Sequence, residues 1–473
     1  MQTSLHPAQV RADCVPRRHL AFGLTRRSIV LLLAGFVWLA PGFWMPRMSY
    51  AMAAWDALVL LAALLDGLRL PKAKQLTVSR SWVNAPSLDS AAEIELTVEN
   101  GGRMIVECRL VDDLPAALGA EPPTARVRAF PGVPAAVRYR VEPRERGDYE
   151  TGWTYVRYGS PLGLAERWAR APLAQTVRVY PALRMGEEQQ IFLARSRQID
   201  LQLRQARQRG LGRDFESLRE YREGDDLRDV CWTATARRGS LITRQYQTER
   251  SQPVWIVLDC GRLMRSRVAA DPGKSALAVA GDAARVHSKL DHACTTAVSL
   301  AQLALFSGDR VGLLAYGHGI QQRILPGRGA GHMRQLIDAF SQVRAETGEG
   351  DHLRATAVLN RLQPRRSLIL WITDLAESAM RPEVIDGAMQ LVRRHVLLFV
   401  AMAQPEVERI AERRPRTVEQ MFRATAAQEM AGRRELLLAR LHEHGALTLD
   451  LNPDALTSQV LNQYLSVKER AMV

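Results

Sequence analysis

Carboxylates and guanidinium groups alternate most densely between residues 213 and 229. The carboxylates are Asp214, Glu216, Glu220, Glu223, Asp225, Asp226 and Asp229, and the arginines are Arg213, Arg219, Arg222 and Arg228. Three kinds of chemistry are open: a hard-cation site on Asp225, Asp226 and Asp229, acid–base catalysis by paired carboxylates, or an ion-pair network. We favour the network, because interleaved arginines compete for the carboxylate oxygens and the sequence indicates no nucleophile or cleft.

The same stretch and the residues after it are candidates for recognising a partner protein. Bidentate pairing between arginine and a carboxylate fixes orientation as well as adding affinity. The residues expected to face a partner are Arg219, Tyr221, Asp225, Asp226, Arg228, Trp232, Arg237 and Arg238.

A second candidate site consists of Asp259 and Asp374, each of which ends an apolar run of strand length. Open α/β sheets place their ligand crevice at the carboxyl ends of the strands, so this position supports a site hypothesis. The simpler interpretation of Asp374 is that it caps the following helix or pairs with an arginine. Cys260 has no evident histidine partner, which favours a packed small residue over a reactive thiol.

Known catalytic motifs are missing from the sequence. It contains no G-x-x-x-x-G-K-[ST] loop, no G-x-S-x-G elbow, no H-E-x-x-H and no G-x-G-x-x-G after a strand. The glycine-rich run at 327–331 lacks the lysine and hydroxyl that grip phosphates. We therefore expect a protein that is not an enzyme and that uses no cofactor.

The elements that position Asp259 and Asp374 alternate between buried strands and helices. Four continuous apolar runs (PVWIVLD, RVGLLAYG, SLILWITD and HVLLFVA) are typical of strands covered on both faces, and helical stretches are expected at 275–307, 331–343, 352–362 and 383–393. This pattern predicts a doubly wound α/β sheet. Gly317-His318-Gly319 predicts one antiparallel hairpin at its edge, and the Arg-rich residues 404–444 predict a solvated helical insertion.

Residues 76–180 contain short β-branched and aromatic runs instead. Their spacing, with prolines confined to connections, predicts an antiparallel β-sandwich. Asn100-Gly101-Gly102 is a hairpin signal. Since no catalytic cluster stands out, we expect a spacer or interaction module.

Two apolar runs near the N-terminus predict a membrane hairpin. Ile29–Met45 has no charge and Ala51–Leu65 has only Asp56, with tryptophans towards the ends of the runs. A buried core helix and a cleaved signal peptide are the alternatives. Basic residues flank the pair on both sides and only Arg47 lies between the runs, so both flanks should face the cytoplasm. Asp56 could mark a helix contact or functional site, but snorkelling to the interface is the simpler account.

Composition is consistent with these elements. The 473 residues carry a net charge of +14, and five scattered cysteines show neither C-x-x-C nor finger spacing, which is typical of reduced thiols. A positive charge of this size is typical of proteins that bind nucleic acid or lie against an anionic membrane surface. We expect no nucleic acid, because no recognised motif supports it and much of the positive excess lies in the flanks of the membrane runs and in scattered arginines.

At the charged stretch the chain resembles the bacterial domain of unknown function 58 family, in which such a string precedes a von Willebrand factor type A-like domain. The matching residues are Gly212, Asp214-Phe215, Leu218-Arg219-Glu220-Tyr221, Gly224-Asp225-Asp226, Arg228, Trp232 and Ala236-Arg237, with Arg146 to Tyr149 and Ser160 to Leu164 upstream. The resemblance covers nearly the whole chain. It predicts a basic tail (1–27), a transmembrane helical hairpin (28–70), a β-sandwich (71–185), a charged segment (186–252) and a type A-like domain (253–473).

The resemblance also implies a function: a non-enzymatic adaptor, anchored in the bacterial inner membrane, that binds a MoxR-type AAA+ ATPase in protein maturation or cell-envelope processes. The alternative is a metal-dependent type A ligand-binding domain, with Asp259 and Asp374 holding Mg²⁺. The family's first metal loop, D-x-S-x-S, reads Asp259-Cys260-Gly261-Arg262-Leu263 here, so both serine ligands are missing. Thr347 and Thr356 are weak candidates for the usual threonine ligand.

Overall fold

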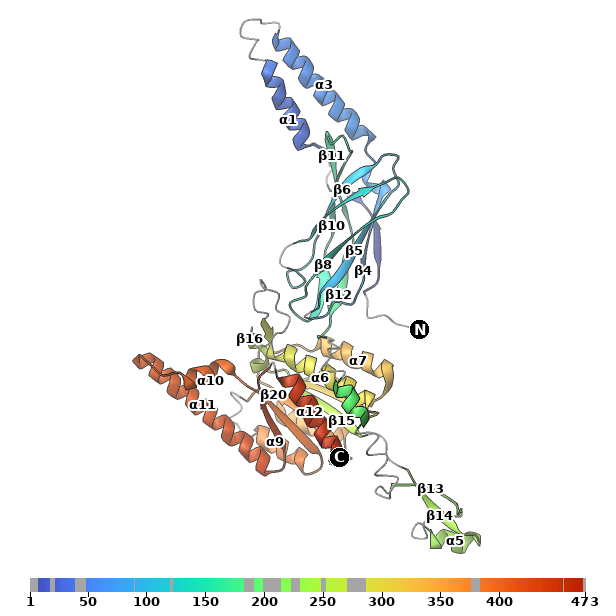
Figure 1. Cartoon of the computed structure of the whole chain (residues 1–473), viewed down its shortest axis with the longest axis vertical. Coiled ribbons are helices and arrows are strands. Elements are labelled where there is room, and N and C mark those ends of the chain that lie inside the picture. Colours follow the sequence, from blue (N-terminus) through green and yellow to red (C-terminus); the bar gives the residue numbers. More distant parts are fainter. Residues whose placement is uncertain are drawn as a thin grey trace. The chain divides into compact units, whose positions relative to one another are not determined.

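The computed structural model describes residues 7–17, 22–38, 48–88, 90–119, 122–182, 191–198, 214–222, 230–247, 252–269, 286–375, 383–453 and 455–470. The chain divides into two compact units, residues 1–182 and 183–473 (Figure 1). Each unit has its own sheets and its own hydrophobic core.

The first unit contains an apolar helix pair, α1 (Arg26–Gly35, followed by the 3-10 turn η1, Phe36–Trp38) and α3 (Met48–Arg69), drawn in blue in Figure 1. Trp55 Nε1 in α3 donates to the Leu31 carbonyl oxygen in α1 at 2.9 Å. Among the described residues one helix, Tyr50–Arg69, is long and apolar enough to cross a membrane. Residues 39–45 of the first apolar run lie outside the described residues, so the two-span hairpin stays a prediction.

Asp56 lies at the contact between these two helices. A Cβ added to Gly35 of α1 would lie 2.7 Å from Asp56 Oδ1, so the absence of a side chain at Gly35 lets the carboxylate approach α1. The Oδ1 atom is buried and has no hydrogen-bond partner. The expected snorkelling is therefore not what the structure shows, because the carboxylate packs against the neighbouring helix.

The end of α3 is joined to the β-structure of the same unit. The buried Asp66 Oδ2 accepts from the backbone N–H groups of Leu164 and Ala165 at 3.2 and 3.1 Å. Arg167 Nη2 donates to the Gly67 carbonyl oxygen at 3.0 Å, and Tyr158 Oη donates to that of Pro71 at 2.8 Å. The Ser160 to Leu164 stretch therefore has a structural role at the base of the apolar helix.

Two antiparallel sheets make up most of the first unit. In spatial order, the first contains β1 (Val10–Asp13), β4 (Leu76–Trp82), β5 (Ala92–Asn100) and β8 (Ala135–Val141). The second contains β2 (Val15–Pro16), β11 (Ala165–Ala171), β10 (Thr154–Gly159), β6 (Val106–Asp112) and β7 (Thr124–Ala129), with β3 (Phe22–Leu24) beside β11. A separate pair joins β9 (Gly147–Thr151) to β12 (Gln175–Val179). One buried cluster includes Val78 and Leu96 from the first sheet and Leu110 and Val156 from the second.

The Asn100-Gly101-Gly102 turn does not form the predicted hairpin between paired strands. It connects β5 to β6, but these strands belong to different sheets. The Gly102 N–H donates to Asn100 Oδ1 at 2.9 Å, and Asn100 Nδ2 donates to the Met104 and Ala129 carbonyl oxygens. The asparagine side chain thus stabilises a crossover between sheets, which a turn motif alone cannot distinguish from a hairpin.

The second unit contains a six-stranded mixed sheet. Its strands, in spatial order, are β19 (Ile320–Gly327), β18 (Arg310–Tyr316), β15 (Pro253–Asp259), β20 (Leu368–Thr373), β21 (Val396–Met402) and β22 (Leu447–Leu451). The edge strand β19 is antiparallel to β18, as the glycine turn predicted, and the other pairs are parallel. This sheet fits the type A-like domain that the resemblance predicted.

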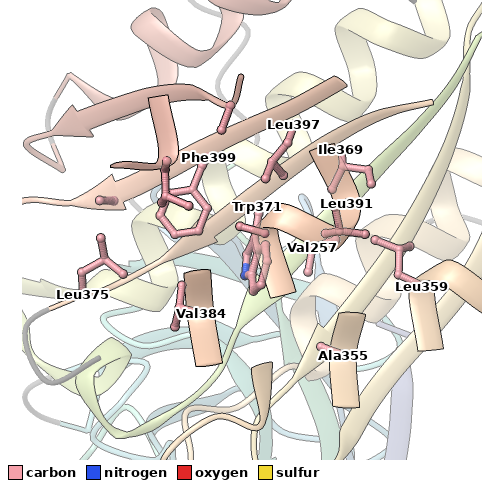
Figure 2. Packing of buried hydrophobic residues seen from close by; sticks show 14 of the residues in the cluster. Val257, Ala355, Leu359, Ile369, Trp371, Leu375, Val384, Leu391, Leu397 and Phe399 are labelled. Atoms are coloured by element: carbon pink, nitrogen blue, oxygen red, sulfur yellow. The ribbon is translucent and has the colours of Figure 1, made fainter. Parts of the chain in front are cut away.

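Helices surround this sheet. They are α6 (Lys289–Phe306), α7 (Gly329–Gln342), α8 (His352–Leu362), α9 (Glu383–Val392), α10 (Pro405–Glu412), α11 (Val418–Glu443) and α12 (Leu456–Glu469). Figure 2 shows Trp371 of β20 packed among Ala355 and Leu359 of α8 and Val384 and Leu391 of α9. The helix expected at 275–307 is described only from Lys289, where a short pair, β16 (Arg267–Ala269) and β17 (Val286–Ser288), precedes it.

The charged segment contributes a small β-hairpin with a helix in its connection. β13 (Asp214–Glu220) pairs antiparallel with β14 (Ile242–Gln247), and α5 (Trp232–Arg238) lies between them in the chain. Gly239 ends α5 with a φ of +69°, a left-handed conformation that favours glycine. Residues 223–229 lie outside the described residues.

Candidate functional site

Asp259 and Asp374 occupy neighbouring strand ends, as predicted. Asp259 is the last residue of β15, Asp374 directly follows β20, and these two strands pair in parallel. Both carboxylates are buried. Asp259 Oδ1 accepts from the Gly261 N–H at 2.8 Å, and its Oδ2 accepts from Thr373 Oγ1 at 2.6 Å. The parallel register therefore brings together two acidic groups that are far apart in the sequence.

Close backbone packing explains why a glycine stands at 261 in the loop after β15. A Cβ at Gly261 would come within 2.8 Å of the Gly350 nitrogen. A Cβ at Gly350 would in turn come within 2.6 Å of Asp259 Oδ1. A serine at 261, as in the family's metal loop, would require the loop around Gly350 to move.

Asp374 is surrounded by hydrogen-bond donors. Its Oδ2 lies 2.5 Å from Lys289 Nζ, and Gln404 Nε2 donates to both of its oxygens at 3.3 and 3.2 Å. Arg434 Nη1 lies 3.7 Å from Oδ1, and the same guanidinium binds Asp450 at 2.6 and 2.9 Å. The simpler interpretation of Asp374 thus identified the right kind of contact, but its nearest cation is a lysine.

A divalent ion does not fit this arrangement. The described residues contain no group of three His, Cys, Asp or Glu side chains placed to hold a metal. Neither candidate threonine serves, because Thr347 is exposed and Thr356 Oγ1 donates to the His352 carbonyl oxygen at 2.9 Å. The hydroxyl that does contact Asp259 belongs to Thr373. With the Lys289 ammonium against Asp374, the metal assignment to Asp259 and Asp374 has no support in the geometry.

A buried chain of three polar side chains lies near Asp259. Trp371 Nε1 donates to Tyr316 Oη at 2.7 Å, and Tyr316 Oη lies 2.8 Å from His352 Nδ1. The indole N–H can only donate, so Tyr316 Oη is the acceptor in that contact. In the contact with His352 Nδ1 either atom can donate, and the direction depends on the tautomer of the imidazole.

Burial accounts for the electrostatics of this region. It lowers the pKa of His352 and raises that of Asp259, while the attraction between the two groups opposes both shifts. Burial also raises the pKa of the Tyr316 phenol well above its usual value. Cys260 is completely buried, with Sγ 3.7 Å from the Leu258 carbonyl oxygen, so it packs as a small residue.

The structure describes five of the eight residues that were expected to face a partner. Trp232 begins α5 and is 65% exposed, and Arg237 and Arg238 are exposed in its last turn. Arg219 and Tyr221 are half-buried. Asp225, Asp226 and Arg228 lie outside the described residues. Two further exposed apolar side chains, Leu218 and Leu241, belong to the same hairpin and were missed by sequence reasoning.

Residues 217–415 match the family described as "Protein of unknown function DUF58". This is shorter than the near-complete coverage that the resemblance suggested. The uncharacterized proteins Mb1516 of Mycobacterium bovis and Rv1480 of Mycobacterium tuberculosis are each 25% identical over 200 residues. Each match covers 41% of this chain and 56% of the relative, so the chain spans about half the length of these curated relatives.

Solved structures with likeness to the chain include the conserved hypothetical protein BatB from Bacteroides thetaiotaomicron, at 13% identity and a TM-score of 0.31. That likeness covers 46% of this chain and all of BatB. The SpRpn10 VWA domain is 12% identical, with 45% of this chain and 95% of that domain covered and a TM-score of 0.24. Since these scores are too low to carry an argument, the fold assignment rests on the order and direction of the strands. The stretch that matches the DUF58 family model, residues 217–415, contains the end of the charged segment and the strands β15, β18, β19, β20 and β21 of the mixed sheet.

Proposed function

We propose that this chain is a membrane-anchored, non-enzymatic adaptor that recruits a cytosolic partner through its charged segment. The apolar α3 helix supports membrane association. The binding role is taken from the family resemblance. The basic residues that flank both apolar runs favour two spans with the following domains in the cytoplasm.

The observation that carries the proposal is the exposure of Trp232. A tryptophan with 65% of its surface in solvent is unusual, because so large an apolar side chain normally packs against its own protein. Tryptophan and arginine are also the residues that most often dominate binding energy at protein interfaces. Arg237 and Arg238 lie in the same short helix, and the exposed Leu218 and Leu241 lie in the adjoining hairpin.

These side chains favour a particular kind of partner surface. Trp232 needs an apolar pocket, and Arg237 and Arg238 need acidic groups near it. The class of partner, a MoxR-type AAA+ ATPase, is taken from the family resemblance. In such a complex the ATPase hydrolyses the nucleotide, and this chain supplies a docking surface at the membrane.

The state of the strand-end carboxylates supports a non-enzymatic role. Asp259 is engaged by Thr373 and a backbone N–H, and Asp374 is engaged by Lys289 and Gln404. Carboxylates held in this way are poor candidates for a general base, which must reach its substrate.

The test is affinity purification of the full-length chain from its native membrane in mild detergent with ATP, followed by mass spectrometry. We expect an AAA+ ATPase to accompany the wild-type chain, and Trp232→Ala to reduce its recovery at least tenfold. The matched control is Leu325→Ala, which shortens an apolar side chain that is 58% exposed on β19 and should leave recovery unchanged.

Two results would count against the proposal, in different ways. Equal recovery with Trp232→Ala and with the control would exclude this surface while leaving the partner in place. A wild-type chain that brings down no ATPase would exclude the partner class. Asp226→Ala extends the test to a predicted contact outside the described residues, and unchanged recovery would remove it from the surface.

A further inference from the structure

We infer that the ammonium group of Lys289 is a tethered cation that takes the place of a metal ion at the strand ends of the second unit. In this arrangement the carboxylate of Asp374 is neutralised by the chain itself, and the site is complete without a divalent ion. The inference is independent of the proposed adaptor surface.

The contact itself is the first observation. Lys289 Nζ lies 2.5 Å from Asp374 Oδ2, and the side chains of the two residues are 2% and 0% exposed. A carboxylate removed from water to this extent is stable only when a cation or several donors compensate its charge. Lysine supplies a compact positive charge, which makes it a closer substitute for a metal ion than arginine would be.

The placement of Lys289 in its helix is the second observation. Lys289 is the first residue of α6, after the N-cap Ser288, whose side chain forms a capping box with Asp291. The Lys289 N–H also donates to the Ser266 carbonyl oxygen at 2.9 Å, which fixes the start of the helix. A cation at a helix N-terminus is disfavoured by the helix dipole, so its presence there requires compensation. Asp374 supplies it.

The remaining donors around Asp374 close the site from other elements. Gln404 follows β21 and donates to both carboxylate oxygens, and Arg434 reaches Asp374 from α11. Arg434 also pairs with Asp450 of β22, so one network connects α6 and α11 with the ends of three neighbouring strands. A divalent ion would have to displace Lys289 to reach Asp374 Oδ2.

The experiment compares thermal unfolding of the full-length chain in detergent with EDTA, with Mg²⁺ and with Mn²⁺. The wild-type Tm should be the same in all three conditions. Lys289→Ala should lower the Tm, and Mn²⁺ should restore part of the loss, because the variant leaves space for a cation beside Asp374. Lys289→Met is the matched control: its uncharged chain fills the space, so its lowered Tm should not respond to Mn²⁺.

Two outcomes would overturn the inference. A wild-type Tm that rises with Mg²⁺ or Mn²⁺ and falls with EDTA would show that a metal binds alongside the lysine. A Lys289→Ala variant that responds to Mn²⁺ no more than Lys289→Met would show that the ammonium does not stand in for an ion. If Lys289→Ala is recovered unfolded, refolding with and without Mn²⁺ gives the same comparison: refolding only with Mn²⁺ supports the inference, and refolding in neither condition overturns it.

Discussion

Each unit of the chain contains a buried ion pair, and the two pairs are built differently. In the first unit, Arg80 of β4 and Asp112 of β6 are both completely buried and link the two antiparallel sheets. In the second unit, Lys289 and Asp374 meet at the carboxyl end of β20, an interior strand of the mixed sheet. The first pair lies inside a core, whereas the second lies where several elements converge.

The number of hydrogen bonds distinguishes the two pairs. The Arg80 guanidinium also donates to Thr151 Oγ1, Thr154 Oγ1 and the carbonyl oxygens of Leu173 and Gly152, and Asp112 also accepts from Thr154 and Tyr139. The planar fork of arginine suits such a network, because its donors point in fixed directions. The comparison indicates that Arg80 holds the two sheets of the first unit together, whereas Lys289 neutralises the buried carboxylate of Asp374.

Arg80→Met should have the largest effect. It leaves Asp112 buried without its cation, which costs about 3–5 kcal/mol of unfolding free energy. Urea unfolding followed by circular dichroism measures the change. Arg128→Met is the control, because the Arg128–Glu107 pair at 2.5 Å is more than half exposed and its loss should leave the midpoint unchanged. Equal midpoints for the two variants would contradict a structural role for Arg80.

Lys289→Met should cost less than Arg80→Met, about 1–3 kcal/mol, because Asp374 keeps Gln404 and Arg434 as donors. The same urea titration compares the two variants directly. A loss as large as that of Arg80→Met would show that the other donors do not compensate Asp374, and the distinction between the two pairs would fail.

The smallest expected effect depends on pH and involves His352. Its pKa is lowered by burial in the folded protein, so the unfolded chain takes up the proton first as the pH falls. The stability from the neutral imidazole is therefore present above pH 6.5 and is lost below it. His352→Asn keeps a side chain that can either donate to or accept from Tyr316, but it does not titrate. The stability of this variant should therefore fall by about 1 kcal/mol less than that of the wild type between pH 7.5 and 5.5. If the wild type and His352→Asn show the same dependence of unfolding free energy on pH, titration of His352 does not contribute to stability.

The strands of the mixed sheet show what sequence patterns can predict. β15, β18, β20 and β21 were all expected, because a strand covered on both faces is continuously apolar. The last strand, β22, was not expected, because this edge strand is only half-buried and carries Thr448 and Asp450 between its leucines. The turn at Asn100 was recognised as a turn, but which strands it joins depends on long-range pairing.

By itself the sequence determined the apolar helices, the antiparallel and parallel regions, and the positions of Asp259 and Asp374 at strand ends. These features follow from local periodicity, since a strand or helix shows its buried face in the spacing of apolar residues. Only the tertiary structure decided what the two aspartates contact. Lys289 lies 85 residues before Asp374, and no local pattern relates the two. They meet because the start of α6 is folded onto the end of β20, where a buried carboxylate requires a compensating charge.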